Sequence, residues 1–536
     1  MIRISDVSIK YYEDMEALKR KVLKILGVSD KKLNSFKISK KSLDARRKKD
    51  IKYIYSVDVC LNCDEISLVN KINNSKVKIH EEFEYKIPKV DISNNKRPVV
   101  VGFGPAGMFA SLVLAEAGMN PIILERGEDV DTRSEKVERF WSGSALDVSS
   151  NVQFGEGGAG TFSDGKLNTG VKNERISWIL NQFVKHGANE NIIYDAKPHI
   201  GTDILKKVVK SIRNRIIDLG GEILFSSKFS DFDCNDDKII SLLYERDGNW
   251  NQIECDDVIL SLGHSARDTF VMLNDKGLNM EAKTFSMGVR IEHEQSMINL
   301  SQYGGVYESL PNADYKLSCH INENESAYTF CMCPGGYVVG ATSEENCVVT
   351  NGMSYQKRDG KNANSALLVT IRPDDFPIKS VLGGMYWQRE LEQKAFEMGG
   401  STYFAPAQLL GDFMIGKKSE RFGKVKPTYR PGVTFCDLNE LLPKKISRVL
   451  KQAIPELDKK LNGFLSQDAI LTAIETRSSS PVRIIRNQNT RESTSVKGIY
   501  PAGEGAGYAG GIMSAAIDGM LSAEAIIKKR GDLNAI

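Results

Sequence analysis

Cysteine is scarce in this chain, and its scarcity excludes two classes of protein. Nine cysteines in 536 residues are too few for a disulfide-stapled secreted fold and fit a reducing compartment. Cys331 and Cys333 are expected on one face of a strand, and Cys60 and Cys63 form a lone CxxC. Because neither pair has a second pair beside it, we expect no metal site, and structural thiols instead.

Long apolar segments and a strong net charge are also lacking. The start, MIRISDVSIKYYEDMEALKRK, has no apolar core of the kind that a secretory signal carries. No run of about 18 apolar residues predicts a membrane-spanning helix. A net charge of +3 does not indicate a class of binding partner. A content of 41% hydrophobic residues is typical of a globular chain with sizeable cores. We expect a cytoplasmic protein of about two to four domains without membrane contact.

What the chain does contain is a glycine-rich motif after an apolar run. Val99–Val101 is predicted to be a buried parallel strand. Gly102, Gly104 and Gly107 follow in the spacing GxGxxG. The first glycine permits a tight turn, the second lets the backbone approach a pyrophosphate, and the third lets a helix pack closely on the sheet. The motif predicts a dinucleotide-binding unit, with a purely structural glycine turn as the alternative.

A helix and an acidic residue complete this unit. The helix is expected to begin at Pro105 and Ala106 and to end before Gly118, and its N-terminus favours the phosphates of a nucleotide. A second apolar run ends at Glu125, where an acid that binds a ribose is expected. The next residue, Arg126, is a candidate phosphate contact.

The C-terminal segment GIYPAGEGAGYAGGIMS (498–514) resembles the second flavin motif of flavoproteins with two dinucleotide-binding domains. The resemblance implies that Glu504 holds the ribityl chain and that the following loop faces the flavin pyrimidine edge. The segment VILSLG (258–263) resembles the strand that returns the chain to the FAD domain. These motifs imply FAD rather than NAD. The residues they assign to the cofactor are Gly263, Gly503, Glu504, Gly510, Gly511 and Ile512.

A second glycine-rich stretch, FGEGGAGTFSDGK (154–166), requires a close approach of the backbone to another group. In related flavoproteins the corresponding stretch passes the pyrophosphate and the flavin. It contains no cysteine, so the C-x4-C of flavin disulfide reductases is missing and a dithiol mechanism is not expected. The cofactor contacts expected here and in neighbouring segments are Arg133, Gly157, Gly158, Thr161, Lys166 and Phe229.

Further segments make the chain similar to the bacterial FAD-dependent dehydrogenases described as NAD(FAD)-utilising. The segments are FGEGGAGTFSDGKLN (154–168), MGVRIEH (287–293), YTFCMCPGGYV (328–338), NGMS (351–354) and ETRSSSPVR (475–483). The resemblance covers nearly the whole chain and implies a cofactor and an architecture, but no substrate. Because no second strand–GxGxxG–helix unit occurs, we expect no dedicated NAD(P)H domain, and any NAD(P)H would visit the flavin transiently.

The order of predicted elements gives the expected fold class, an α/β protein with a discontinuous Rossmann-like FAD-binding domain. Residues 1–90 follow the order βαββαβ of a ferredoxin-like α+β domain, and residues 91–97 are a linker. The FAD-binding domain comprises residues 98–282 and 466–536, and a β-rich substrate domain is inserted at 283–465. A helix over residues 202–217 is expected to be capped by Thr202 or Asp203.

The N-terminal residues are basic. Residues 1–97 contain 23 Lys and Arg against 14 Asp and Glu, whereas the remainder contains 49 against 55. The densest cluster is formed by Lys40, Lys41 and residues 46–49. It could bind RNA phosphates. No aromatic RNA-binding motif accompanies it, so a solvated basic face, or a contact with an acidic surface of the same chain, is the favoured interpretation.

Four residues are candidates for chemistry beside the flavin: Lys166, Arg290, His293 and Arg477. Arg290 or Arg477 would anchor an anionic substrate, and His293 would move a proton while the flavin moves a hydride. The alternative interpretations are an ordinary hydrogen-bonded histidine and, for Lys166, a surface lysine.

These features favour an FAD-dependent oxidoreductase that transfers a hydride between a small organic substrate and flavin N5. The first alternative is an FAD-dependent RNA-modifying enzyme that uses the basic N-terminal domain, although the Cys-Asn-Pro motif of tRNA-modifying flavoproteins is absent. The second is a flavin-bound sensor without turnover. The oligomeric state stays open.

Overall fold

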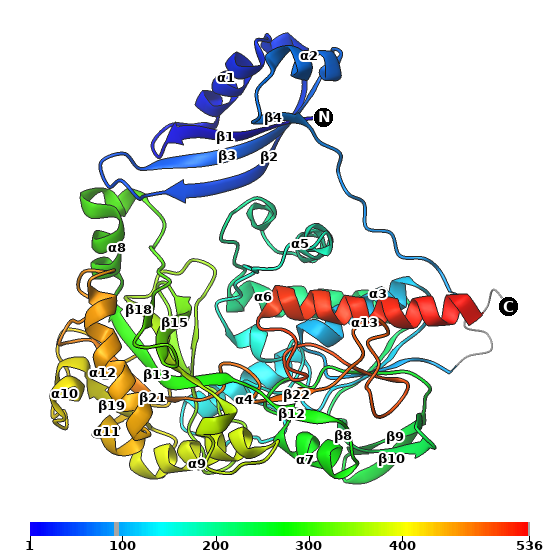
Figure 1. Cartoon of the computed structure of the whole chain (residues 1–536), viewed down its shortest axis with the longest axis vertical. Coiled ribbons are helices and arrows are strands. Elements are labelled where there is room, and N and C mark those ends of the chain that lie inside the picture. Colours follow the sequence, from blue (N-terminus) through cyan, green and yellow to red (C-terminus); the bar gives the residue numbers. More distant parts are fainter. Residues whose placement is uncertain (91–95, 534–536) are drawn as a thin grey trace.

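The computed structural model describes residues 1–90 and 96–533 of the chain (Figure 1). Residues 91–95 of the expected linker, and 534–536 at the end of the expected FAD-binding domain, lie outside the described residues. An N-terminal α+β unit (blue in Figure 1) lies above a larger body that contains a parallel sheet and a mixed sheet.

The N-terminal unit has the element order βαββαβ that the sequence predicts. Its elements are β1 (Ile2–Lys10), α1 (Met15–Leu26), β2 (Leu33–Asp44), β3 (Lys52–Leu61), α2 (Glu65–Ile72) and β4 (Val77–Ile79). The strands form an antiparallel sheet in the order β2-β3-β1-β4. Alternate apolar residues of the strands, such as Ile4 and Val57, pack with Leu18 and Val22 of α1 in a core of their own.

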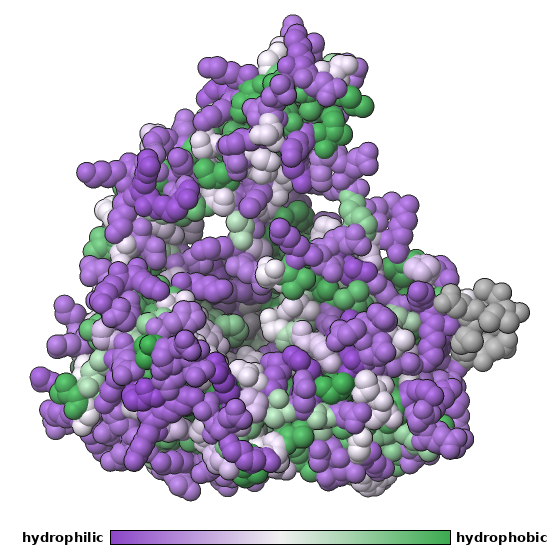
Figure 2. Space-filling model, in the orientation of Figure 1, coloured by the Kyte–Doolittle hydropathy of each residue, from purple (hydrophilic) through white to green (hydrophobic). Residues whose placement is uncertain are grey.

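Contacts of several kinds attach this unit to the body. The edge strand β2 is extended by a neighbouring segment, since the Lys41 N–H donates to Tyr194 O (2.7 Å) and the Ala196 N–H donates to Lys41 O (2.8 Å). Ile51 is buried in the core of the mixed sheet. The Tyr85 hydroxyl donates to Glu524 (2.5 Å). Figure 2 shows this face of the molecule hollowed beneath the N-terminal unit.

The parallel sheet joins segments that are far apart in the sequence. Its order is β23-β11-β5-β6-β7, with β5 (Val99–Val101), β6 (Ile122–Leu124), β7 (Glu222–Leu224), β11 (Val258–Leu260) and β23 (Ile499–Pro501). The helices α3 (Pro105–Glu116), α6 (Thr202–Asp218) and α13 (Ile512–Leu533) share a buried apolar cluster with it. The glycine-rich segments after β5, β11 and β23 therefore leave the sheet at the same edge.

Smaller elements surround this sheet. Strands β8 (Lys228–Asn235), β9 (Lys238–Arg246) and β10 (Asn249–Glu254) form the predicted meander, whose turn places Asp247 and Gly248 at φ values of 51° and 74°. The helices nearby are α4 (Val130–Trp141), α5 (Arg175–Lys185) and α7 (Arg267–Asp275).

The predicted cap of α6 is wrong. The residue that precedes the helix is Gly201, and no side chain caps it. The Thr202 hydroxyl instead donates to Thr161 O (2.6 Å), and Asp203 accepts the N–H of Gln356 (2.9 Å). Both side chains are used for contacts between segments, which the local sequence does not reveal.

The mixed sheet has seven strands in the order β14-β15-β18-β13-β21-β19-β20. They are β13 (Phe285–Glu294), β14 (Ser318–His320), β15 (Ser326–Cys333), β18 (Asn362–Ile371), β19 (Ala405–Leu409), β20 (Val433–Phe435) and β21 (Ile470–Glu475). The predicted β-like runs between 286 and 371 are confirmed as strands. Two-stranded sheets form between β12 (Met280–Ala282) and β22 (Val482–Ile484), and between β16 (Tyr337–Gly340) and β17 (Thr350–Met353).

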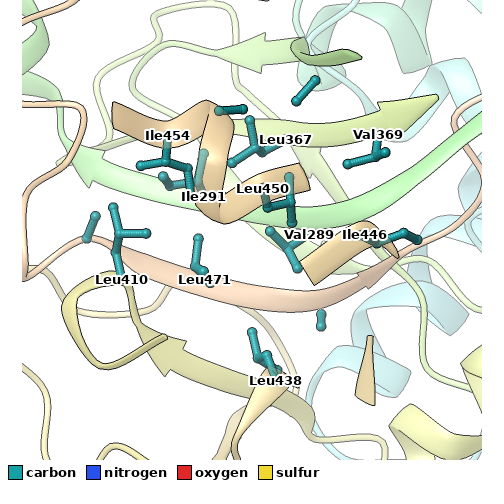
Figure 3. Close-up of a cluster of buried hydrophobic side chains, with 14 of the residues drawn as sticks. Val289, Ile291, Leu367, Val369, Leu410, Leu438, Ile446, Leu450, Ile454 and Leu471 are labelled. Atoms are coloured by element: carbon teal, nitrogen blue, oxygen red, sulfur yellow. The ribbon is translucent and has the colours of Figure 1, made fainter. Parts of the chain in front are cut away.

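Helix α12 (Lys444–Asp458) covers one face of the mixed sheet. Figure 3 shows Ile446, Leu450 and Ile454 of this helix against Val289 and Ile291 of the central strand β13. The other helices of this part are α8 (Gln295–Tyr303), α9 (Gly383–Met398), α10 (Leu410–Ile415) and α11 (Leu438–Leu441). Among the described residues, none of the helices combines the length and apolar character needed to cross a membrane.

Candidate active site

A cavity of about 490 Å³ lies between the parallel sheet and the mixed sheet. We call its lining from residues 101–106, 124–126, 158–160, 261–266 and 502–515 the glycine wall. The lining from residues 314–316, 329–333, 351–352 and 475–478 is called the inserted wall. Residues 163–166 and Asn168 line the cavity between the two walls.

The glycine wall begins with the turn after β5. Gly102 adopts a φ of 93°, and a Cβ there would lie 2.4 Å from Ser261 O. A Cβ on Gly104 would meet only Gly158 Cα, at 3.8 Å, so this position is open toward the cavity. Helix α3 has Gly104 as its N-cap and no side-chain cap. Its first free N–H groups thus suit an anionic pyrophosphate.

Glu125 fastens the loops of this wall. Its buried carboxylate accepts the N–H groups of Phe103 (2.7 Å), Gly127 (2.9 Å) and Gly155 (2.9 Å). A carboxylate has about four lone-pair sites, so about one is left for a ribose hydroxyl. The contact of Glu125 with a ribose stays a prediction, and the remaining lone-pair site leaves room for it.

Arg133 is fully buried and does not line the cavity, so its expected contact with a phosphate is wrong. Its guanidinium donates to four backbone carbonyls, those of Asn151, Val152, Glu156 and Gly158, at 2.7–3.0 Å. Burial lowers the pKa of Arg133 to about 10, although the Glu125 and Glu156 carboxylates oppose this. Arg133 therefore shapes the glycine-rich loop from behind. Arg126 does line the cavity, and it pairs with Asp268 at 2.7 Å.

At the other end of the glycine wall, β23 leads into α13. The Gly503 N–H donates to Asp518 (2.8 Å), which Arg486 holds at 2.8 Å. Glu504 lines the cavity with an oxygen 3.4 Å from His264 Nδ1. Gly510 and Gly511, exposed in the cavity lining, precede the first turn of α13. Two helix N-termini thus open into one cavity, which fits a dinucleotide cofactor.

The structure brings most of the expected cofactor residues together. Those that line the cavity are Gly102, Gly104, Pro105, Ala106, Glu125, Arg126, Gly158, Lys166, Phe229, Gly263, Gly503, Glu504, Gly510, Gly511 and Ile512. Gly107, Gly157 and Thr161 do not line it. For Gly107 this fits the close packing of the helix that the sequence predicts, whereas Gly157 and Thr161 lie outside the lining in which their cofactor contacts are expected. A Cβ on Gly107 would lie 1.9 Å from Gly102 O, and one on Gly157 would lie 2.2 Å from Thr161 Oγ1. These residues permit close packing of the loops and of α3.

Arg290 lies behind the inserted wall, not in it. It is fully buried and bonds Glu475 (2.8 and 3.1 Å), Asn364 (2.9 Å) and Cys331 O (2.6 Å). Because its guanidinium is surrounded by protein acceptors and does not line the cavity, the expected anchoring of a substrate by Arg290 is corrected. Arg290 instead holds strands β15, β18 and β21 together, with Glu475 as its counter-ion.

His293 is also removed from the cavity. It is 1% exposed, its Nε2 lies 2.8 Å from Phe464 O, and its ring packs on that of Phe464. Burial lowers the pKa of His293 to about 4. It does not line the cavity, so its expected role as a proton donor to a substrate is corrected. The hydrogen-bonded structural histidine that the sequence left as the alternative describes its position.

Arg477 does line the cavity, and it joins the two walls. Its guanidinium donates to Glu392 (2.7 Å), Ser343 (2.5 Å) and Ser265 (3.2 Å). Arg267 of α7 binds the same Glu392 carboxylate at 2.7 Å. Arg477 therefore shares its carboxylate partners with other arginines, and anchoring of a substrate by Arg477 stays a prediction.

A group of possible metal ligands lies in the same network. One ligand atom each of Glu344, Cys347 and Glu392 lies within 4.8 Å of the others. Both carboxylates are ion-paired with arginines, Arg389 and Arg267 among them. Burial, with the nearby carboxylates, raises the pKa of the Cys347 thiol to about 12, whereas a metal binds the thiolate. The chemistry of these donors therefore indicates ion pairing.

The inserted wall contains a β-bulge that the sequence does not predict. Phe330 pairs with Ala366 but Cys333 pairs with Asn364, so β15 has one extra residue here. Cys331, at a φ of 44°, is exposed in the cavity lining, whereas Cys333 is buried. The two thiols therefore do not share one regular strand face as expected. The Lys166 ammonium donates to Met332 O of this bulge.

Comparisons with known proteins agree with the cofactor expectation. Residues 284–478 match the model of the family described as FAD-dependent protein, C-terminal domain-like, and residues 1–60 match a domain of unknown function, DUF8436. A protein of Clostridium beijerinckii described as uncharacterized is 48% identical over 532 residues, which cover 98% of this chain and 99% of that protein. The match to the FAD-dependent family confirms FAD as the cofactor.

Two solved structures show weaker likeness. A geranylgeranyl bacteriochlorophyll reductase-like protein from Thermoplasma acidophilum is 11% identical, with 81% of this chain and 79% of that chain covered and a TM-score of 0.37. Quinol fumarate reductase FrdA from E. coli is 12% identical, with 81% and 70% covered and a TM-score of 0.35. Neither TM-score reaches 0.5, and the assignment of FAD depends on the family match and on the residues.

Proposed function

The chain belongs to one family with the Clostridium beijerinckii protein, and we propose that it is an FAD-dependent oxidoreductase that transfers a hydride between flavin N5 and a small organic substrate. The observation that carries the proposal is a cavity with two different walls. One is lined by glycines and two helix N-termini, and the other by thiol, amide, carboxylate and ammonium side chains. The first suits FAD, and the second suits a substrate.

The residues of each wall have separate tasks in this proposal. The N–H groups at the start of α3 bind the pyrophosphate, and Glu125 keeps the surrounding loops in place. Those at the start of α13 would stabilise negative charge on the flavin pyrimidine edge. When bound, FAD supplies the hydride acceptor or donor. The inserted wall positions the substrate against it, with Cys331 of this wall and Lys166 of the segment between the walls facing the cavity.

Anaerobic reduction of the purified protein tests the proposal. We expect FAD to be released on denaturation and the bound flavin to be reduced in stopped flow by at least one organic substrate of a metabolite panel that includes NADH and NADPH. A chain that holds FMN, or no flavin, contradicts the cofactor. Flavin that photoreduces normally but reacts with no substrate, reductant or acceptor would favour a sensor.

RNA modification is a second candidate because of where the basic residues lie. Lys41 of the basic cluster bonds the segment 194–196, next to the cavity-lining residue Lys197. Arg46 is highly exposed, and its charge is met by Asp44 at 2.7 Å. Copurified RNA, and binding of a labelled RNA that weakens steeply with salt, would support this candidate. Binding that is absent at low salt would reject it.

A further inference from the structure

We propose that the inserted wall is a subsite for a carboxylate group of the substrate, with Lys166 as its cationic partner and Lys316 at the rim. The proposal rests on the proposed function for the location of the substrate. Its own basis is the charge that the protein leaves unbalanced around this part of the cavity. Neither the family match nor the glycine motifs assign a substrate charge.

The acids that line this part of the cavity already have cationic partners inside the protein. The pairs are Asp164 with Arg358 (2.9 Å), Asp314 with Lys197 (2.6 Å) and Glu475 with Arg290 (2.8 Å). Arg477 shares Glu392 and Glu344 with Arg267 and Arg389, so this cluster does not add negative charge to the cavity. The charges of the three lining acids are cancelled by their partners, so none of these acids repels an anionic ligand.

Two lysines of the lining have no such partner. Lys166 is half-buried and donates to Met332 O, and it forms no ion pair within residues 1–90 and 96–533. Lys316 is exposed, and the described part of the chain gives it no carboxylate partner either. A partly desolvated ammonium that contacts only a carbonyl is stabilised by an anion that enters the cavity. Because the acids are neutralised, the net charge of this part of the lining is positive.

A carboxylate suits the neighbouring groups better than a bulkier anion. The side chains of Asn351 and Cys331 line the cavity beside the bulge that Lys166 contacts. Phe330, which is 39% exposed, provides an apolar surface for the rest of an organic molecule. One cation, an amide and an apolar surface correspond to a small organic acid, whereas phosphate esters are commonly bound by several cations or N–H groups at once.

Cys331 provides a reporter inside the subsite. The residue is exposed in the cavity lining, but the surrounding walls desolvate its thiol and raise the pKa, while the charge of Lys166 acts in the opposite direction. Iodoacetate and iodoacetamide both alkylate a thiolate: the sulfur forms a bond to the CH2 carbon and iodide leaves. They are nearly equal in size, but iodoacetate carries a carboxylate.

The experiment compares the alkylation rates of the two reagents in the FAD-bound protein, measured by mass spectrometry of each cysteine peptide. The exposed thiols Cys63 and Cys234 and the unfolded chain serve as references. We expect the iodoacetate-to-iodoacetamide rate ratio at Cys331 to exceed the references by about tenfold, as one nearby opposite charge can produce. A ratio equal to the references, or a Cys331 that neither reagent reaches, overturns the proposal.

Variants identify the cation. Lys166→Met, compared with wild type at equal FAD occupancy, should return the ratio at Cys331 to the reference value, and Lys316→Gln should lower it by a smaller factor. Lys78→Gln, on the exposed side of β4 in the N-terminal unit, is the charge-matched control and should change nothing. An unchanged ratio in Lys166→Met overturns the proposal, and loss of FAD with that unchanged ratio would assign Lys166 to the cofactor.

The two proposals can fail separately. The wild-type ratio requires no variant and no turnover, so it tests the subsite even if Lys166→Met does not fold or no substrate is found. If the ratio is raised but no organic substrate reduces the flavin, the carboxylate subsite stands and the oxidoreductase proposal fails. If flavin is reduced by neutral substrates only and the ratio is not raised, the oxidoreductase proposal stands and the carboxylate subsite fails.

Discussion

The two walls of the cavity present different chemical groups: backbone groups in the glycine wall and side chains in the inserted wall. The glycine wall presents backbone N–H groups and open Cα positions, and its shape is kept by buried groups such as Glu125 and Arg133 that bond other backbone groups. The inserted wall presents side chains, and it is kept in place by buried ion pairs such as Arg290–Glu475. The first wall should therefore be sensitive to added atoms, and the second to removed charges.

The largest effect is expected where an added side chain enters the cofactor space. Gly104→Val should abolish FAD binding, because the new atoms project into the open region where a pyrophosphate would approach α3. The apoprotein should still fold, since a Cβ there meets only Gly158 Cα at 3.8 Å. FAD content after purification, together with circular dichroism, measures both.

Gly107→Ala is the matched control for that prediction. Its Cβ would lie 1.9 Å from Gly102 O, so it should damage the packing of α3 and lower the stability of the protein as well as its flavin content. Stoichiometric FAD in Gly104→Val would contradict the placement of the pyrophosphate at this turn.

The second prediction concerns the ion pair behind the inserted wall. Arg290→Met leaves the buried Glu475 without its counter-ion, and we expect the free energy of unfolding to fall by about 3–5 kcal/mol. Replacing both residues, as Arg290→Met with Glu475→Leu, should recover most of that loss because no uncompensated charge remains. Urea denaturation measures the series. Undiminished stability in the single variant would mean that Arg290 is free for a substrate, as the sequence suggested.

The difference between the walls also explains what the sequence could predict. The spacing of Gly102, Gly104 and Gly107 encodes a local turn, so the strand, the turn and the helix follow from neighbouring residues. The surroundings of Arg290 depend on which strands flank β13. Strand β21 pairs with β13 so that Glu475 lies opposite Gly288, and this register is set by tertiary packing.

Residue type alone was therefore misleading in the inserted wall. Arg290 and His293 are chemically suited to catalysis, but both are directed into the protein. The sequence predicts that Cys331 is a structural thiol, whereas the extra residue in β15 exposes it to the cavity. The sequence contains no local signal for that bulge. The C-x-C spacing of Cys331 and Cys333 marks the two thiols as neighbours, but it does not show which of them is exposed.

The third prediction uses the pH dependence of stability to test the position of His293. Its pKa is lowered by burial from 6.5 to about 4, so between these values the unfolded chain binds a proton that the folded protein does not. Stability from this group is fully present above pH 6.5 and is lost as the pH falls toward 4. The total loss is about 3 kcal/mol.

His293→Gln removes this contribution. The difference in unfolding free energy between wild type and variant should shrink as the pH falls from about 7 to 4, by about 1.4 kcal/mol per pH unit at most. Urea titrations at several pH values measure it, and the subtraction removes the effect of other groups, such as Glu156, whose pKa burial raises to about 7. A difference that does not change with pH would show that the pKa of His293 is the same in the folded and the unfolded chain, as for an imidazole that is open to solvent.

The smallest effect is expected at the bulge that places Cys331 in the cavity. Its φ of 44° lies in the left-handed region, where a residue with a Cβ is less stable than glycine by about 1 kcal/mol. Cys331→Gly should therefore be more stable than Cys331→Ala by about that amount, with FAD bound equally in both. Chemical denaturation of the two variants side by side measures the difference, and the Ala variant controls for loss of the thiol. Equal stabilities would mean that the backbone at residue 331 is not held at positive φ. A positive difference would mean that the chain keeps a side chain on this wall where glycine would fold more easily, which is the pattern expected of a residue that contacts a ligand.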